Sequence, residues 1–182
     1  MDKRQAILQA TAKLIALHGL QNTPTSLIAN EAGVGEGTIY RYFKDKEALV
    51  VTVYRGLIED FNNAVTLEDM NSGFVKERFF VFYRNLFHFC QNNREKTALF
   101  DYLSISPLLK TVAEETTKHI NQALIQLFID GKAQQLIRND VEIEVSMLFL
   151  FGAITTLAKK RLVSTEDQIE TVLQMAWNSI RA

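Results

Sequence analysis

The chain has 182 residues, of which 47% are hydrophobic and 23% are charged, and its formal net charge is −1. The hydrophobic content excludes a disordered chain, and the near-neutral charge excludes a whole-molecule field that attracts nucleic acid, so any DNA binding must rest on local residues. The single cysteine, Cys90, excludes an intrachain disulfide, and the chain shows neither a signal-peptide core nor an apolar run long enough to span a bilayer, so we expect a soluble, cytoplasmic protein without membrane contact.

The residue pattern predicts an all-α fold. Only two prolines and eight glycines occur, and valine, isoleucine and threonine never settle into the alternation that marks β-strands. In the first helix, apolar residues recur at three- and four-residue steps from Ala6 to Leu17, and Gly19 stands where a left-handed C-terminal cap is expected. We expect about nine helices, over residues 3–18, 26–32, 36–43, 45–63, 73–91, 94–104, 107–135, 141–162 and 166–180.

Residues 23–49 contain two short helical patterns separated by a Gly-Val-Gly turn at 33–35. The glycine ends the first helix, and Val34 can fill the corner between the two. The second helix buries Ile39 and Phe43, which are four residues apart. Two short helices joined by a tight glycine turn form the geometry that places the second helix in a DNA major groove. By spacing alone, a three-helix subdomain that packs on the rest of the protein is an equal alternative.

The remaining face of the second helix carries an aromatic ring, a guanidinium group and small residues. Arg41 can bond the paired acceptors of a guanine, and Tyr40 can pack on a thymine methyl or meet a phosphate. Thr25, which can also cap the first helix, is placed with Tyr42 and Lys46 to hold the DNA backbone. The predicted DNA-contacting residues are Thr25, Ser26, Glu36, Gly37, Thr38, Tyr40, Arg41, Tyr42, Lys44 and Lys46.

This stretch resembles the DNA-binding signature of TetR-type transcriptional regulators, at Ile28-Ala29, Ala32-Gly33-Val34, Gly37-Thr38-Ile39-Tyr40, Tyr42-Phe43, Lys46 and Leu49. The resemblance implies an all-helical homodimeric repressor whose variable C-terminal domain binds a ligand and sets the spacing of the two DNA-reading heads. It divides the chain into a helix-turn-helix domain at 1–47 and a ligand-binding and dimerisation domain at 48–182. Two residues depart from the family pattern, Gly35 in place of the frequent Ser and Glu36 in place of the frequent Lys, and they bear on operator sequence and affinity.

The helix at 45–63 leads from the reading module into the larger domain. Asp45 can cap its start, and Gly56 in its middle costs roughly 1 kcal/mol relative to alanine. Either another helix crosses there too closely for a side chain, or Gly56 is a bend point that lets the reading head swing.

The helix at 73–91 is apolar almost all round and is rich in phenylalanine. A helix with this pattern is buried on most sides. It is either a central core helix or the wall of a cavity for an apolar or aromatic effector. On the second interpretation the candidate ligand-binding residues, some from neighbouring helices, are Phe79, Phe82, Tyr83, Phe87, His88, Phe100, Tyr102 and His119.

The last two helices are also unusually apolar, and small residues in the first of them permit close helix approach. They suit a four-helix interface with a second copy of the chain, or they close the core of the single chain. The candidate dimerisation residues are Phe149, Gly152, Ala153, Thr156, Val172, Ala176 and Trp177.

The sequence contains no phosphate-binding glycine loop, no HExxH motif, no Cys/His cluster with metal spacing and no nucleophile–base pair. We therefore predict no enzyme, no cofactor, no metal and no catalytic residue. The leading hypothesis is a homodimeric repressor that binds a pseudo-palindromic operator and is released by a small apolar or aromatic effector. The alternatives are a helical small-molecule-binding or structural dimer that no longer reads DNA, which Glu36 and the near-neutral charge favour, and a cofactor-free helical-bundle enzyme.

Overall fold

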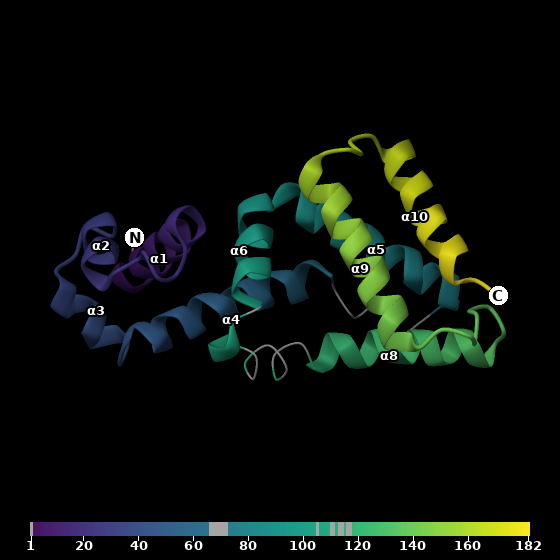
Figure 1. The fold of residues 1–182 in the computed structure, drawn as a ribbon, viewed down its shortest axis with the longest axis horizontal. Coiled ribbons are helices and arrows are strands. Elements are labelled where there is room, and N and C mark those ends of the chain that lie inside the picture. The colour runs from purple at the N-terminus through teal and green to yellow at the C-terminus, as the bar shows by residue number, and fades with distance from the viewer. Residues whose placement is uncertain (1, 66–72, 105, 110–111, 113–114, 116–117) are drawn as a thin grey trace. The chain divides into compact units, whose positions relative to one another are not determined.

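A computed structural model describes residues 2–65, 73–104, 106–109, 112, 115 and 118–182, with the backbone alone for residues 108 and 119–121 (Figure 1). The prediction of an all-α fold is confirmed. The described part contains a 3-10 helix, Pro107–Leu109, and nine α-helices: α1 (Lys3–His18), α2 (Thr25–Glu31), α3 (Glu36–Tyr42), α4 (Lys46–Ala64), α5 (Val75–Asn92), α6 (Arg94–Ser104), α8 (Lys118–Ala133), α9 (Ile143–Lys160) and α10 (Glu166–Ile180).

The helix ends agree with local signals in most places. Asp45 caps α4, because its Oδ1 accepts from the Ala48 N–H at 2.7 Å, and Thr165 caps α10 in a reciprocal pair with Gln168. The helix expected at 107–135 is described as the 3-10 turn and α8, and much of the segment between them lies outside the described residues. Residues 66–72, whose polar composition predicts a linker, also lie outside the described residues.

The sequence Asn139-Asp140 before α9 predicts an N-cap there, because both residue types favour that position. This prediction is wrong, since Glu142 occupies the N-cap position without a side-chain bond. Asp140 is instead bound by the Arg138 guanidinium, whose Nε lies 2.6 Å from Oδ1. A charge-assisted bond to arginine is stronger than a neutral bond to a backbone amide, which explains why the carboxylate is not free to cap.

The chain divides into two compact units, Met1–Glu59 with Glu95–Thr116, and Asp60–Arg94 with Thr117–Ala182. We call them the N-terminal and the C-terminal unit. Helix α6 therefore belongs to the N-terminal unit, although it follows α5 of the C-terminal unit in sequence. The proposed domain boundary at residue 47 falls inside the N-terminal unit.

The N-terminal unit has its own hydrophobic core, built from α1 to α4 and α6. Fully buried members include Ile7, Ile28, Ile39 and Leu49. The predicted stripe of α1 is wrong at its end, because Leu17 is 64% exposed and Ile15 is buried in its place. The four fully buried aliphatic side chains stabilise the unit by about 1.5 to 3 kcal/mol each through apolar burial.

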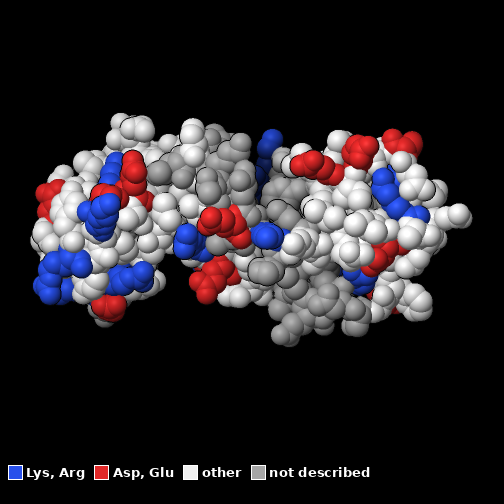
Figure 2. Space-filling view, turned by 90° about the horizontal axis from the view of Figure 1, so that it is seen from below, with Lys and Arg blue, Asp and Glu red and all other residues white. Residues whose placement is uncertain are grey.

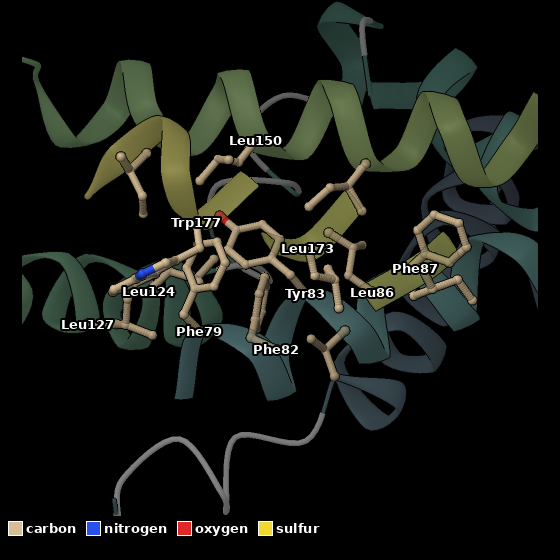
Figure 3. Close-up of a cluster of buried hydrophobic side chains, with 14 of the residues drawn as sticks. Phe79, Phe82, Tyr83, Leu86, Phe87, Leu124, Leu127, Leu150, Leu173 and Trp177 are labelled. Atoms are coloured by element: carbon tan, nitrogen blue, oxygen red, sulfur yellow. The ribbon is translucent and has the colours of Figure 1, made fainter. Parts of the chain in front are cut away.

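The core of the C-terminal unit is arranged around α5, which packs against α8, α9 and α10 (Figure 3). The rings of Phe79 and Tyr83 lie 4.6 Å apart, and Phe79 also meets Trp177 of α10 edge-on at 5.1 Å. Such aromatic pairs add about 0.5 to 1.5 kcal/mol beyond the area that they bury. Of the two interpretations of this helix, these contacts support the central core helix.

The end of α8 closes against the C-terminus. A Cβ at Gly131 would lie 2.4 Å from Cδ1 of Ile137, so this glycine is required by close packing. Ile137 is buried, and an isolated antiparallel bridge pairs it with Arg181. Among the helices of the described residues, none combines the length and hydropathy needed to cross a membrane.

Candidate functional site

Helices α2 and α3 are joined by a tight turn at residues 32–35. Gly33 has a φ of +66°, a left-handed conformation that favours glycine, and the Val34 N–H donates to the Ala29 carbonyl at 2.9 Å. Val34 is half-buried against the core of the N-terminal unit. The turn therefore has the form that the Gly-Val-Gly sequence predicts, with valine in the corner.

Helix α3 buries one face and exposes the other. Ile39 is fully buried and Phe43, directly after the helix, is 5% exposed, whereas Tyr40 is 51% and Tyr42 44% exposed. The other predicted contact residues at this surface are exposed, except that Thr25, Thr38 and Lys46 are half-buried: exposed are Ser26, Glu36, Gly37, Arg41 and Lys44. The helix thus presents a tyrosine, an arginine and a glycine on its outer surface.

Three of these residues bind one another. The Thr25 hydroxyl donates to Oε1 of Glu36 at 2.7 Å and lies 3.2 Å from the Tyr40 hydroxyl. Thr25 was expected to cap α2, but Pro24, in an extended conformation, is the N-cap residue and Thr25 is the first residue of the helix. The Thr25 side chain therefore bridges to α3, a contact that local sequence patterns do not predict because its partner is eleven residues away.

The Lys46 side chain makes a hydrogen bond within the N-terminal unit. Its Nζ donates to the Leu20 carbonyl at 2.9 Å, and the Leu20 N–H donates to the Tyr102 hydroxyl of α6 at 3.1 Å. Tyr102 was predicted to contact an effector, whereas here its hydroxyl holds the loop between α1 and α2. Lys46 has further N–H donors, so one bond within the protein still leaves donors for a phosphate.

Positive charge is local to this end of the chain. Residues 1–46 carry six Lys and Arg against four Asp and Glu. Figure 2 shows Lys and Arg side chains gathered at the end formed by α1, α2 and α3, with Asp and Glu side chains between them. One acidic side chain, Glu31, is occupied by Lys13, whose Nζ lies 2.5 Å from its Oε1. The surface is weakly basic, so phosphate attraction contributes modestly to binding.

Three glycines inside helices, Gly37, Gly56 and Gly152, have no internal reason to be glycine. A Cβ at Gly37 of α3 or at Gly152 of α9 would meet no described atom within 4 Å, and neither residue has a positive φ. Glycine inside a helix costs roughly 1 kcal/mol relative to alanine. Space for an approaching molecule would account for this cost at both positions. Gly56 of α4 is similarly open, so the close helix crossing considered for it is absent among the described atoms.

The predicted effector-binding residues are not gathered in one place. Phe79, Phe82, Tyr83 and Phe87 are buried in the core of the C-terminal unit, and burial raises the pKa of the Tyr83 phenol, which keeps it neutral. His88 is half-buried, with its Nε2 3.8 Å from Oε2 of Glu166 on α10. Phe100 and Tyr102 belong to the N-terminal unit, and the side chain of His119 lies outside the described residues.

Tyr54 of α4 is a further candidate, which the sequence pattern does not indicate. Its side chain is fully buried, and its hydroxyl has no hydrogen-bond partner among the described residues. Its ring stacks on Phe100 of α6 at 5.5 Å. An unpaired buried hydroxyl is costly and calls for an explanation, such as a ligand that accepts a hydrogen bond from it. Only the tertiary structure could reveal this group, because tyrosine in an apolar helix face reads as ordinary core.

The predicted dimerisation residues divide into exposed and buried ones. Phe149 is 61% exposed, and Gly152, Ala153 and Thr156 are exposed beside it on α9. Val172 and Ala176 of α10 are half-buried. Trp177 is 5% exposed and lies against Phe79 in the core, so it has little surface to offer a partner.

Two family models match the chain. The first, described as bacterial regulatory proteins of the tetR family, covers residues 7–53, and the second, a tetracyclin repressor-like C-terminal domain, covers residues 75–181. The first therefore includes α2, the turn and α3, and the second includes α5 and α8 to α10.

Individual relatives agree with these models. The chain is 32% identical over 76 residues to the fatty acid metabolism regulator protein of Bacillus subtilis, a match that covers 42% of this chain and only 39% of that regulator. A TetR-family transcriptional regulator structure from Vibrio parahaemolyticus is 28% identical, with a TM-score of 0.79 and full coverage of both chains. The transcriptional regulator FadR from Bacillus subtilis, in complex with stearoyl-CoA, is 22% identical and has a TM-score of 0.75 over 97% of this chain and 98% of that one, which shows the shared fold.

The helix-turn-helix, the helical domain that follows it in the sequence and both family models therefore lead to one conclusion. They confirm the predicted resemblance, and they assign the chain to transcriptional regulators rather than to enzymes. The chain belongs to the TetR family of bacterial regulatory proteins, as a DNA-binding transcriptional regulator with an N-terminal helix-turn-helix and a C-terminal helical domain.

Proposed function

We propose that this regulator is a homodimeric repressor that places two α3 helices in successive major grooves of a pseudo-palindromic operator, about 34 Å apart. The observation that carries the proposal is the outer face of α3, where Tyr40 and Arg41 are exposed around a glycine whose missing side chain serves no internal packing. Arg41 reads guanine, Tyr40 packs on the DNA, and Ser26, Tyr42, Lys44 and Lys46 hold the phosphates.

The second copy docks on α9. Val145, Leu148 and Phe149 are 56%, 69% and 61% exposed, and Gly152 and Thr156 continue the same side of the helix at three- and four-residue steps. Exposed apolar residues in one stripe mark interaction surfaces, and the open glycine allows a partner helix to come close. The stripe forms the centre of the interface, with Val172 and Ala176 at its edge.

Selection of a binding sequence from random duplexes, followed by mobility shift at modest salt, tests DNA reading. The wild-type chain is expected to select one pseudo-palindrome, and Arg41→Ala is expected to weaken binding to it by about 1 to 3 kcal/mol with relaxed preference at one base pair. Arg55→Ala, an exposed arginine on α4 of the same unit, is the matched control and should bind like wild type. Equal binding by Arg41→Ala would reject the assignment of α3 as the recognition helix.

Sedimentation velocity tests the interface. Phe149→Glu places a charge in the centre of the α9 stripe and is expected to convert the dimer to a monomer, because a buried unpaired charge is strongly unfavourable. Glu144→Gln, a nearby exposed substitution on the same helix, should leave the dimer intact. A dimer that survives Phe149→Glu would place the interface elsewhere.

An apolar effector releases the operator because it favours a dimer conformation in which the spacing of the two α3 helices no longer matches the two half-sites. The Tyr54 hydroxyl and the Phe100 ring are the proposed contacts, because they offer an unsatisfied donor beside an aromatic surface. Stearoyl-CoA, bound by the Bacillus subtilis regulator of the same fold, is the first probe. We expect an active effector to release the operator in a mobility shift and Tyr54→Phe to blunt that release. If stearoyl-CoA has no effect on the wild-type chain, it is not an effector of this regulator.

A further inference from the structure

We infer that Glu36 reads the exocyclic amine of a cytosine in each operator half-site, and that Thr25 is the positioning residue that aims it. The inference rests on the proposed DNA-reading function and adds one base preference to it. Its foundation is the bonded set of Tyr40, Thr25 and Glu36 on the surface formed by α2 and α3.

The number of protons available assigns the donor and the acceptor in each of these hydrogen bonds. The Glu36 carboxylate can only accept, and its Oε1 lies 2.7 Å from the Thr25 hydroxyl. Thr25 has one hydroxyl proton, which goes to Glu36. The Tyr40 hydroxyl, 3.2 Å from Thr25, must therefore be the donor in that contact. The chain of donors runs from Tyr40 through Thr25 to Glu36, and it holds the carboxylate in one orientation.

For the same reason, the Thr25 hydroxyl cannot donate a hydrogen bond to a DNA phosphate. A hydroxyl that has already donated its proton to a carboxylate has none left for a phosphate oxygen, which is itself an acceptor. Thr25 was predicted to hold the DNA backbone, and this geometry gives it another task. Ser26, its exposed neighbour, has a hydroxyl free of any such constraint in the described contacts.

A carboxylate that enters a DNA groove needs a donor there. Phosphates, guanine N7 and O6, and thymine O4 are all acceptors, and the major-groove donors are the amines of cytosine and adenine. Adenine places its N7 acceptor beside its amine, which repels a carboxylate, whereas cytosine presents the N4 amine alone. Glu36 is exposed at the start of α3, next to the side-chain-free position Gly37, where it can come close to a base edge.

The test compares base preferences of four chains selected on the same random duplexes: wild type, Glu36→Gln, Thr25→Val and Ser26→Ala. We expect the wild-type operator to hold a cytosine at one position per half-site. Replacing that C·G pair by T·A should weaken wild-type binding by about 5-fold or more, which is the lower end of the cost of one mismatched base pair.

The variants should distinguish residues that contact a base from residues that contact a phosphate. For Glu36→Gln and Thr25→Val the same base-pair replacement should change affinity by less than about 3-fold, because the oriented carboxylate is gone. Ser26→Ala should bind every duplex more weakly while keeping the cytosine preference, as expected for a phosphate contact. All of the altered side chains are on the surface of α2 and α3, and circular dichroism verifies that each variant is folded.

Three outcomes would overturn the inference in distinguishable ways. If Glu36→Gln keeps the wild-type preference and binds all duplexes more tightly, the carboxylate only repels phosphate, and DNA reading by α3 still stands. If Thr25→Val loses affinity uniformly with the cytosine preference intact, Thr25 is a phosphate contact. A wild-type chain that selects no sequence removes the proposed function and this inference together.

Discussion

The two units of this regulator differ in where they place their aromatic residues. In the N-terminal unit the aromatic and charged residues of α3, such as Tyr40 and Arg41, are exposed on the surface and are not part of the core. In the C-terminal unit the rings that dominate α5, from Phe79 to Phe87, are buried in the core and contact one another. The candidate functional surface there is the α9 stripe around Phe149, which is much less conspicuous in the sequence.

This difference gives a criterion for candidate sites. A residue is a candidate for binding when packing within the chain does not explain its type. Examples are an exposed phenylalanine and a glycine with open space around it. Gly131 fails the criterion because Ile137 occupies the place of its side chain, whereas Gly37, Gly56 and Gly152 meet it. The predictions below test whether the residues assigned to packing and those assigned to binding can be separated by experiment.

The largest separation is expected between two phenylalanines of the C-terminal unit. Phe79→Ala should lower the free energy of unfolding by about 3 to 5 kcal/mol, because it removes a fully buried ring and leaves a cavity beside Trp177. Phe149→Ala should change the stability of the monomer by less than about 0.5 kcal/mol. Urea unfolding at low protein concentration measures both, and similar losses would contradict the division into core and interface.

A smaller separation is expected between two ion pairs of the C-terminal unit. Arg78 is nearly buried and pairs with Asp130 at 2.7 Å, and its Nε has no partner among the described residues. Asp130→Asn should lower the free energy of unfolding by about 2 kcal/mol, because it leaves a nearly buried guanidinium uncompensated. Asp140→Asn, which removes the exposed partner of Arg138, should have an effect that chemical denaturation barely detects.

The same pair gives a pH dependence. The hydrogen bond from Arg78, followed by that from Gln126, lowers the pKa of the Asp130 carboxyl below its ordinary value. A lowered pKa in the folded state means that the pair stabilises the fold above the unfolded value, near 4, and that this contribution disappears as the pH falls through the folded pKa. Wild type should therefore lose more stability than Asp130→Asn between about pH 5 and pH 2, and parallel curves would show that the pair contributes nothing.

Three glycine substitutions test the criterion directly. Gly131→Ala should destabilise by about 1 to 3 kcal/mol, since the new Cβ collides with Ile137. Gly37→Ala and Gly152→Ala should instead stabilise the isolated chain by up to about 1 kcal/mol through helix propensity. Each should weaken one association, operator binding for Gly37→Ala and self-association for Gly152→Ala. If both associations are unchanged while stability rises, the open space at these glycines has no binding role.

The smallest effect is expected at Tyr54. Tyr54→Phe removes a buried hydroxyl that has no described partner, so the free energy of unfolding should stay within about 0.5 kcal/mol of wild type or rise. Tyr40→Phe, which removes an exposed hydroxyl, is the matched control. A loss of about 1 kcal/mol or more at Tyr54 would indicate a hydrogen bond in solution and would remove the reason to place an effector there.

Local sequence signals predicted much of the fold. Caps such as Asp45 and Thr165 act within a few residues, so their patterns could be read directly. The helix-turn-helix was predicted for the same reason, because Gly33 and the spacing of Ile39 and Phe43 define a turn and a buried face without reference to the rest of the chain.

The tertiary structure decided the questions that depend on distant partners. Periodicity names the inner face of a mixed helix such as α3, but it cannot choose among the faces of helices that are apolar nearly all round, such as α5 and α9. Neighbouring helices made that choice, burying Phe79 of α5 and leaving Phe149 of α9 exposed. They also brought Thr25 to Glu36 and Tyr102 to Leu20. The sequence by itself therefore determined that this chain is a helical DNA-reading regulator, because that information is local, and packing determined which residues remain available for binding.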